Sequence, residues 1–270
     1  MNKKIMIAIL LIVTAVSAAA EIDEPNNTYV LIVGGINKDP EERQSKDKAV
    51  TRLQKIFLKN ANIPSGRIKI LVSDNSFVHK KTGLSTAENL KKIIDELASI
   101  VKASDRFIFY YIGQANVISA KLRLNLPGED ITHEQLAELI NEIKASRKVI
   151  ILDCPHAGLT VRKMSGPGRV VLCGSRSDQP YSPRFSEYFV PAMIDIAADV
   201  NGDEKISLLE AFTMASQQVD ELYRSQDLLK TENPVLEDDG DGIPSQQPWR
   251  YEVEENDGLT ASKIFLTEDG

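Results

Sequence analysis

Cysteine is scarce in this chain, and no cysteine or histidine pattern typical of a zinc site occurs. The 270 residues include two cysteines, Cys154 and Cys173, and three histidines. Two cysteines are too few for a disulfide-based scaffold, and neither CxxC nor HExxH is present. The fold must therefore depend on an apolar core, and a chain of this length is long enough to bury a sizeable one.

Excess positive charge is also lacking, and long apolar runs are confined to the N-terminus. The formal net charge is −7, which disfavours binding to nucleic acid or to an anionic membrane surface. The run IMIAILLIVTAV follows two lysines and ends at Ala18–Ala20, a pattern typical of a secretory signal peptide, with an uncleaved anchor as the alternative. We expect a signal peptide over 1–20, a periplasmic or extracellular protein, and no membrane contact beyond that segment.

Strand and helix patterns alternate along the rest of the chain. Apolar runs rich in β-branched residues predict strands at 29–35, 67–74, 106–113, 148–154 and 169–174. Apolar residues at helical spacing predict helices at 46–60, 85–102, 132–145, 184–197 and 207–225. Short connections between them favour an α/β fold whose sheet is mainly parallel, with helices on both faces.

Local signals mark where several of these elements start or turn. Ser85 with Glu88, and Thr132 with Gln135, match the capping pattern at the start of two predicted helices. Residues 116–130 alternate and contain Pro127–Gly128, which predicts a small hairpin.

Two strand ends carry the polar residues of interest. The sequence YIGQA (111–115) follows one predicted strand, and DCPHAG (153–158) follows the next. In an open α/β sheet the carboxyl ends of the strands line the ligand-binding crevice. We therefore expect these two segments to lie together at one edge of the sheet.

At these strand ends the sequence resembles the caspase-like cysteine peptidases, which include metacaspases and legumains, and specifically a bacterial exported branch. The segments LRLNLPGEDITHEQL, SRSDQPYSPRFSEYF and ADVNGDEKISLLEAF extend the resemblance over most of 29–225. The family has His-Gly after one strand and Asp-x-Cys-x-Ser-Gly after the next. In this chain Gln114 occupies the histidine position and Pro155 the cysteine position, whereas Asp153, His156 and Gly158 keep the pattern.

The resemblance implies a peptidase fold without peptidase chemistry. Proline has no nucleophilic side chain and the amide of Gln114 cannot act as a base, so we expect no catalytic residues. The crevice would then bind a peptide or protein partner. Its predicted lining residues are Gln114, Asp153, His156, Arg176 and Arg184.

Two other functions stay open from the sequence. An active cysteine peptidase would use Cys154 with His156 or His133, but successive strand residues face opposite sides, so a one-residue shift misdirects the thiol unless a bulge corrects it. A structural calcium-binding envelope protein is the other alternative. Cys154 and Cys173 both end predicted neighbouring strands, so in an oxidising compartment they are also a candidate disulfide.

An acidic loop near the C-terminus has the spacing of a calcium site. Oxygen-bearing residues stand at positions 1, 3, 5, 7, 9 and 12 of such a loop: Asp199, Asn201, Asp203, Lys205, Ser207 and Glu210. Helices expected on both sides make it an EF-hand-like helix–loop–helix. Glu204 replaces the usual glycine at position 6, so we predict weak calcium binding.

A second acidic stretch, 236–244, resembles the first only in part. It offers Glu237, Asp239 and Asp241, but Pro244 and the lack of a glutamate at the twelfth position favour a turn.

We therefore expect an α/β domain over 21–198, the calcium loop and its helix over 199–226 packed on the same domain, and a C-terminal extension over 227–270.

Overall fold

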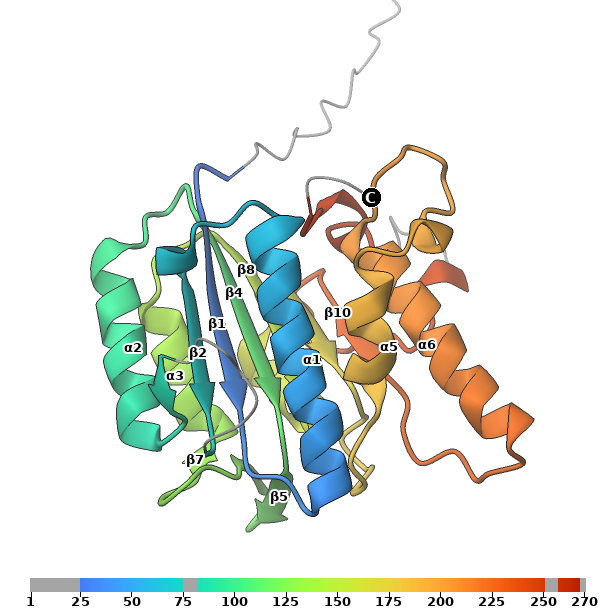
Figure 1. The fold of residues 1–270 in the computed structure, drawn as a ribbon, viewed down its shortest axis with the longest axis horizontal. Coiled ribbons are helices and arrows are strands. Elements are labelled where there is room, and N and C mark those ends of the chain that lie inside the picture. Colours follow the sequence, from blue (N-terminus) through green and yellow to red (C-terminus); the bar gives the residue numbers. More distant parts are fainter. Residues whose placement is uncertain (1–24, 75–81, 251–256, 268–270) are drawn as a thin grey trace, which may run out of the picture.

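The centre of the fold is a seven-stranded sheet (Figure 1), seen in a computed structural model that describes residues 25–74, 82–250 and 257–267. The signal peptide expected over 1–20 lies outside the described residues. The strand order is β10-β9-β8-β4-β1-β2-β3, and only β10 runs antiparallel to its neighbour. The strands are β1 (Thr28–Gly34), β2 (Ile68–Val72), β3 (Gly83–Leu84), β4 (Arg106–Ile112), β8 (Arg147–Asp153), β9 (Arg169–Cys173) and β10 (Val235–Glu237). The predicted mainly parallel sheet is confirmed.

The register of the three central strands brings their carboxyl ends together. Gly34 of β1 lies opposite Ile112 of β4, and Ile112 lies opposite Asp153 of β8. Gly113 then donates its backbone N–H to the Asp153 carbonyl at 3.2 Å. The two segments singled out in the sequence are therefore neighbours in space.

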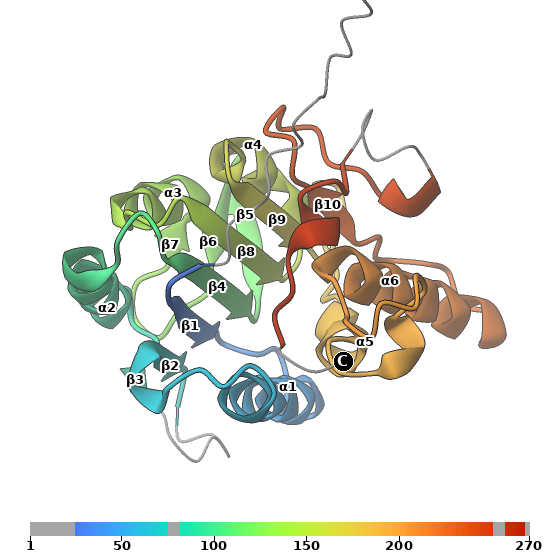
Figure 2. The same cartoon turned by 90° about the horizontal axis from the view of Figure 1, so that it is seen from above.

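Helices cover both faces of the sheet, as Figure 2 shows from above. One face carries α1 (Pro40–Lys59), α5 (Phe185–Ala192) and α6 (Leu208–Ser225), and the other carries α2 (Ala87–Ile100), α3 (His133–Glu142) and α4 (Val161–Met164). Strand side chains alternate between the two apolar cores, as on β8, where Ile151 joins the α1 side and Ile150 and Leu152 the α2 side. Both faces of the central strands are thus buried, which explains their continuous apolar sequences.

Helix starts agree with the sequence at some positions and differ at others. Thr132 and Gln135 form the predicted capping box of α3. The prediction that Ser85 caps α2 is wrong, because Thr86 accepts the backbone N–H of Asn89 while Ser85 Oγ donates to the Gly34 carbonyl at 2.7 Å. Helix α1 starts six residues before the predicted 46, because Asp39 caps it and Pro40 suits the first turn.

The predicted hairpin exists, but its turn lies elsewhere. Strands β5 (Ala115–Ile118) and β6 (Lys121–Leu124) pair antiparallel, and β7 (Ile131–Thr132) completes a small second sheet. The turn is formed by Ser119 and Ala120, both at positive φ, and not by Pro127–Gly128. The paired turn needs φ above zero at both central residues, a conformation that non-glycine residues adopt less readily, so the sequence did not mark it.

The long helix predicted over 184–197 is wrong. Helix α5 ends at Ala192, directly after Pro191, and a separate 3₁₀ turn, η3 (Ile196–Ala198), follows. Proline lacks the N–H that would bond one turn back, which explains the early end. The segment entering the acidic loop is therefore a single short turn, whereas α6 leaves it with a capping box of Ser207 and Glu210.

The described part of the expected C-terminal extension belongs to the same core. Strand β10 extends the sheet next to β9, and Ala261, Ile264 and Leu266 join the α1-side core beside α6. Four further 3₁₀ turns within the described ranges are η1 (Ser65–Arg67), η2 (Ala157–Thr160), η4 (Pro248–Arg250) and η5 (Ala261–Lys263). Across the described ranges, no helix has the combined length and apolar character needed to cross a membrane.

Candidate functional site

A cleft of about 530 Å³ opens at the carboxyl ends of β4 and β8. Its walls are the first turns of α1, the last residues of β4 and β8 together with Gln114, and the loop leading into α5. Five carboxylates and three cationic side chains line it: Asp39, Glu41, Glu42, Asp153, Glu187, Lys38, Lys46 and Arg184. The cleft therefore carries an excess of negative charge.

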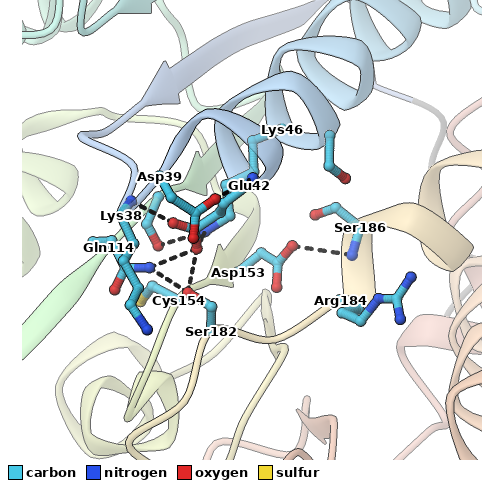
Figure 3. A network of polar contacts seen from close by, with 12 residues as sticks. Lys38, Asp39, Glu42, Lys46, Gln114, Asp153, Cys154, Ser182, Arg184 and Ser186 are labelled. Atoms are coloured by element: carbon cyan, nitrogen blue, oxygen red, sulfur yellow. Dashed lines mark hydrogen bonds and ion pairs between the residues drawn. The ribbon is translucent and has the colours of Figure 1, made fainter.

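Glu42 is the centre of the hydrogen-bond network in this cleft (Figure 3). The Gln114 amide donates to Glu42 Oε1 at 2.5 Å, and it also donates to Ser182 Oγ. Ser182 in turn donates its hydroxyl to the same carboxylate oxygen. The predicted crevice residue Gln114 thus lines the cleft, where it joins α1 to the loop before α5.

Charge and hydrogen bonds together keep Glu42 ionised. Burial alone would raise the pKa of this carboxyl, but the charge of Lys46 and the hydrogen bonds from Ser182, the Lys38 backbone and Gln114 lower it to about 2. Lys46 Nζ lies 2.9 Å from Glu42 Oε1 and donates to the Gly113 carbonyl at 3.1 Å. The first turns of α1 are therefore fastened to the end of β4.

Asp153 forms a buried acidic floor of the cleft. It is 1% exposed, and its Oδ2 accepts the backbone N–H of Ser186 at 3.0 Å. Its Oδ1 is buried without a hydrogen-bond partner among the described residues. Burial raises the pKa of Asp153 to about 6, although Lys46 and Ser186 oppose that shift. Gly174, directly after β9, leaves room for this carboxylate, because an added Cβ there would lie 2.4 Å from Oδ1.

Cys154 points away from the cleft. Its side chain is fully buried in the core on the α2 and α3 side, and it does not line the cleft that Asp153 lines. Burial raises the pKa of this thiol well above its usual value, with Cys173 and Asp153 adding to the effect and Lys46 opposing it. No bulge redirects the side chain, so the strand alternation argued from the sequence holds.

The predicted disulfide between Cys154 and Cys173 is not formed. Both residues are free, fully buried thiols in the same core. Burial raises the pKa of Cys173 to about 12, while Thr160 lies 3.7 Å from its sulfur. The two cysteines therefore act as apolar core residues on the α2 side of the sheet.

Both histidines considered as partners of Cys154 are held elsewhere. His156 is outside the cleft lining, and its Nδ1 lies 2.8 Å from the Ser177 carbonyl. Its backbone is left-handed, at φ 57°. His133 is buried at the start of α3, with Nδ1 3.4 Å from the Leu122 carbonyl. Pro155 is buried and also outside the cleft lining.

Of the two predicted crevice arginines, only Arg184 lines the cleft. Its guanidinium donates to Glu187 at 2.8 and 3.0 Å, and its backbone N–H donates to Glu232 at 2.7 Å. Arg176 instead pairs with Asp178 on an exposed part of the loop. The placement of His156 and Arg176 in the crevice is therefore wrong, because local loop contacts direct both side chains elsewhere.

The acidic loop at 199–210 has side chains folded back onto its own backbone. Asp199 accepts the backbone N–H groups of Gly202 and Glu204, Asn201 accepts that of Asp203, and Asp203 accepts that of Lys205. Glu204 takes the left-handed conformation at φ 64°. The carboxylate oxygens of Asp199, Asp203 and Glu210 do not all lie within 4.8 Å of one another in this described segment. Calcium binding here stays a prediction.

Sequence reasoning missed Glu42, Lys46 and Ser182. Their side chains gather around Gln114 only because α1 starts earlier than predicted and the loop before α5 folds over the strand ends. One signal was available: the acidic residues after Asp39 and Pro40 are typical of a first helical turn that follows a strand. A helix start at this strand edge would have placed Glu42 near the crevice.

Structural comparison identifies the fold. The caspase-1 of Spodoptera frugiperda matches with a TM-score of 0.52 and 10% identity, over 80% of this chain and 87% of that one. The Drosophila initiator caspase Dronc matches with a TM-score of 0.50 and 12% identity, over 80% of each chain. No protein-family model and no curated protein sequence matches. The fold is caspase-like, as the sequence resemblance implied.

A buried glutamate beside the cleft should make stability depend on pH. Glu232 is fully buried, and burial raises its pKa to about 7, opposed by the hydrogen bonds from the Arg184 backbone and Tyr223. The folded state therefore favours the protonated carboxyl of Glu232. The stability that this preference adds to the fold is fully present below about pH 4.5 and is lost as pH rises through 7.

We predict that Glu232→Gln flattens this dependence. Between pH 5 and pH 8 the variant should lose about 2–3 kcal/mol less of its free energy of unfolding than the unmodified protein, measured by denaturant titration at each pH. The matched control is Glu221→Gln. Glu221 forms an exposed ion pair with Arg224, and its replacement should leave the pH profile unchanged. Identical profiles for Glu232→Gln and the unmodified protein would contradict the prediction.

Proposed function

We propose that this caspase-like protein is a peptide-binding module without peptidase activity. The observation that carries the proposal is the composition of the cleft at the strand ends. Among the described residues, its lining contains carboxylates, cations, hydroxyls and the Gln114 amide, but no thiol and no imidazole. A cysteine peptidase needs a thiolate to attack the peptide bond and an imidazole to manage the proton.

The alternative of an active peptidase using Cys154 finds little support. The thiol lies in the core on the opposite face of β8 from the cleft, and its raised pKa keeps it protonated at neutral pH. His156 is tied to the loop carbonyl of Ser177, and His133 is buried at the start of α3. A peptide in the described part of the cleft would therefore meet neither a thiolate nor an imidazole.

The charge of the cleft favours a basic ligand. Two of its three cations are already paired, Lys46 with Glu42 and Arg184 with Glu187. Asp153 lines the cleft, and its Oδ1 is buried without a partner among the described residues, so a ligand donor has to reach the floor of the cleft to bond it. A lysine or arginine side chain of a bound peptide supplies such a donor together with the opposite charge.

Export and weak calcium binding complete the proposed role. The lysine-flanked apolar run over 1–20 supports export. The ligand spacing over 199–210 and the left-handed Glu204 support a calcium loop, although Ser207 and Glu210 are engaged in the capping box of α6. The rival role of a purely structural calcium-binding envelope protein shares this loop but assigns nothing to the cleft.

We predict binding without cleavage when the protein is incubated with a mixed peptide library in reducing buffer containing calcium. Mass spectrometry should detect no new peptide ends. Fluorescence anisotropy should show binding of lysine- or arginine-bearing peptides in preference to matched glutamate-bearing peptides. Asp153→Asn should weaken that binding about tenfold or more, because a hydrogen bond to a charged group contributes about 1.5–3 kcal/mol.

The matched control is Asp178→Asn, which removes an exposed carboxylate outside the cleft lining and should leave binding unchanged. Peptide cleavage that disappears in Cys154→Ala would contradict the proposal that the protein has no peptidase activity. Equal affinity for basic and acidic peptides, or an unaffected Asp153→Asn, would remove the proposed binding role.

We predict that calcium binds the loop at 199–210 with a dissociation constant of about 10⁻⁴–10⁻³ M, the range of extracellular modules. In a two-dimensional NMR titration the amide signals of Gly202 and Glu204, whose N–H groups contact Asp199, should move with that midpoint. Calcium at ten times the dissociation constant should add about 1.4 kcal/mol to the free energy of unfolding. Asp199→Asn should abolish the movement of both signals. Unmoved signals at 10 mM calcium would leave the loop as a capped turn.

A further inference from the structure

The stretch after β10 forms a loop whose carboxylates hold its own backbone. Glu237 Oε1 accepts the N–H groups of Gly240 and Gly242 at 2.8 and 3.2 Å. Asp239 accepts the N–H of Asp241 at 2.9 Å, and Asp241 accepts that of Ile243 at 2.6 Å. The sequence prediction of a turn is therefore incomplete, because this turn is arranged around three acidic side chains.

The two acidic loops share one hydrogen-bond pattern. In each, the first residue accepts the N–H groups of the fourth and sixth, the third residue accepts that of the fifth, and the fifth accepts that of the seventh. The sixth residue is left-handed in both, Glu204 in one loop and Gly242 at φ 78° in the other. Only the second loop has the glycine that this position favours.

A distant aspartate joins the second loop. One carboxylate oxygen from each of Glu237, Asp239 and Asp257 lies within 4.8 Å of those of the other two, which within the described residues is the one such group of three. Asp257 accepts the N–H groups of Asp238 and Ser245, at 2.9 and 2.8 Å. Asp257 thus places a third carboxylate beside the first and third residues of the loop, although it is far from them in the sequence.

An unpartnered buried oxygen points to a missing ligand. Glu237 is 0% exposed and Asp257 is 2% exposed, yet Glu237 Oε2 is buried without a hydrogen-bond partner in the described structure. A buried carboxylate oxygen without a partner is costly, and so is a group of carboxylates so close together. A bound cation would remove both.

We infer that Glu237, Asp239, Asp241 and Asp257, with the Ile243 carbonyl at the seventh position, form a second calcium site at the β10 edge of the sheet (Figure 2). The side-chain donors are all carboxylate oxygens, which suit calcium or magnesium and not zinc. An irregular ring of carboxylates with a backbone carbonyl fits the larger, flexible shell of calcium better than the octahedral shell of magnesium.

The site would fasten the C-terminal segment to the sheet. Asp238, between two of the ligands, accepts the N–H groups of Gly258 and Ala261, both at 2.7 Å. The residues just beyond, Ile264 and Leu266, pack into the core against the α6 side. A cation shared between the β10 loop and Asp257 adds a link that the unfolded chain cannot make, so it stabilises the folded state.

The test uses the full chain after chelation, titrated with calcium chloride and followed by two-dimensional NMR of the glycine amides. The signals of Gly240 and Gly242 should move on calcium addition, with a midpoint at least tenfold below that of Gly202. Asp257→Asn should weaken the Gly240 and Gly242 response at least tenfold and leave the Gly202 response unchanged. Asp199→Asn should do the reverse, so each loop serves as the control for the other.

Unmoved Gly240 and Gly242 signals at 10 mM calcium would overturn the site, as would an unchanged response in Asp257→Asn. An equal response to magnesium chloride at the same concentrations would overturn the choice of calcium. Glu237→Gln gives a second variant with the same expected loss, so the test does not depend on how Asp257→Asn packs. Unchanged signals of β4 amides confirm that each variant is folded.

Discussion

Side chains on β8 alternate between two buried faces, and this constraint determines what the cleft contains. Asp153 turns toward α1 and α5, where it forms the cleft floor, and Cys154 turns into the core beneath α2 and α3. A single-residue offset between the aspartate and the cysteine therefore places their side chains on opposite faces of the sheet. The residue that follows, Pro155, has no nucleophilic group to supply in the thiol's place.

The rest of the cleft is held by the ionised carboxylate of Glu42. It connects the first turn of α1 to Gln114 after β4 and to Ser182 in the loop before α5. Lys46 balances its charge and reaches the Gly113 carbonyl. The position where the sequence resemblance places a catalytic histidine is thus occupied by an amide that serves a structural network. Asp153 lies outside this network, and its Oδ1 is buried without a hydrogen-bond partner among the residues that the structure describes.

The sequence was informative where periodicity and strand ends decide the structure. It predicted the five central strands, both faces of helices, the position of Gln114 and Asp153 at one edge, and the direction of the Cys154 side chain. It was misleading where loops decide, because His156 and Arg176 form local contacts to Ser177 and Asp178 that no spacing rule reveals.

Long-range packing explains the remaining differences. Strand β10 is only three residues long, and its place beside β9 depends on tertiary contacts. Asp257 reaches Glu237 across a sequence separation that hides the relation between them. The two cysteines were close enough in the predicted sheet to suggest a disulfide, but both belong to an apolar core as free thiols.

The reactivity of the Cys154 thiol tests most directly whether this side chain takes part in chemistry at the cleft. Native protein is treated with iodoacetamide at pH 7.5, and modification of Cys154 and Cys173 is followed by mass spectrometry, with protein unfolded in denaturant as the reference. Full burial and a raised pKa predict that neither thiol reacts in the native protein and that both react once it is unfolded. Rapid modification of Cys154 in the folded protein would contradict the account.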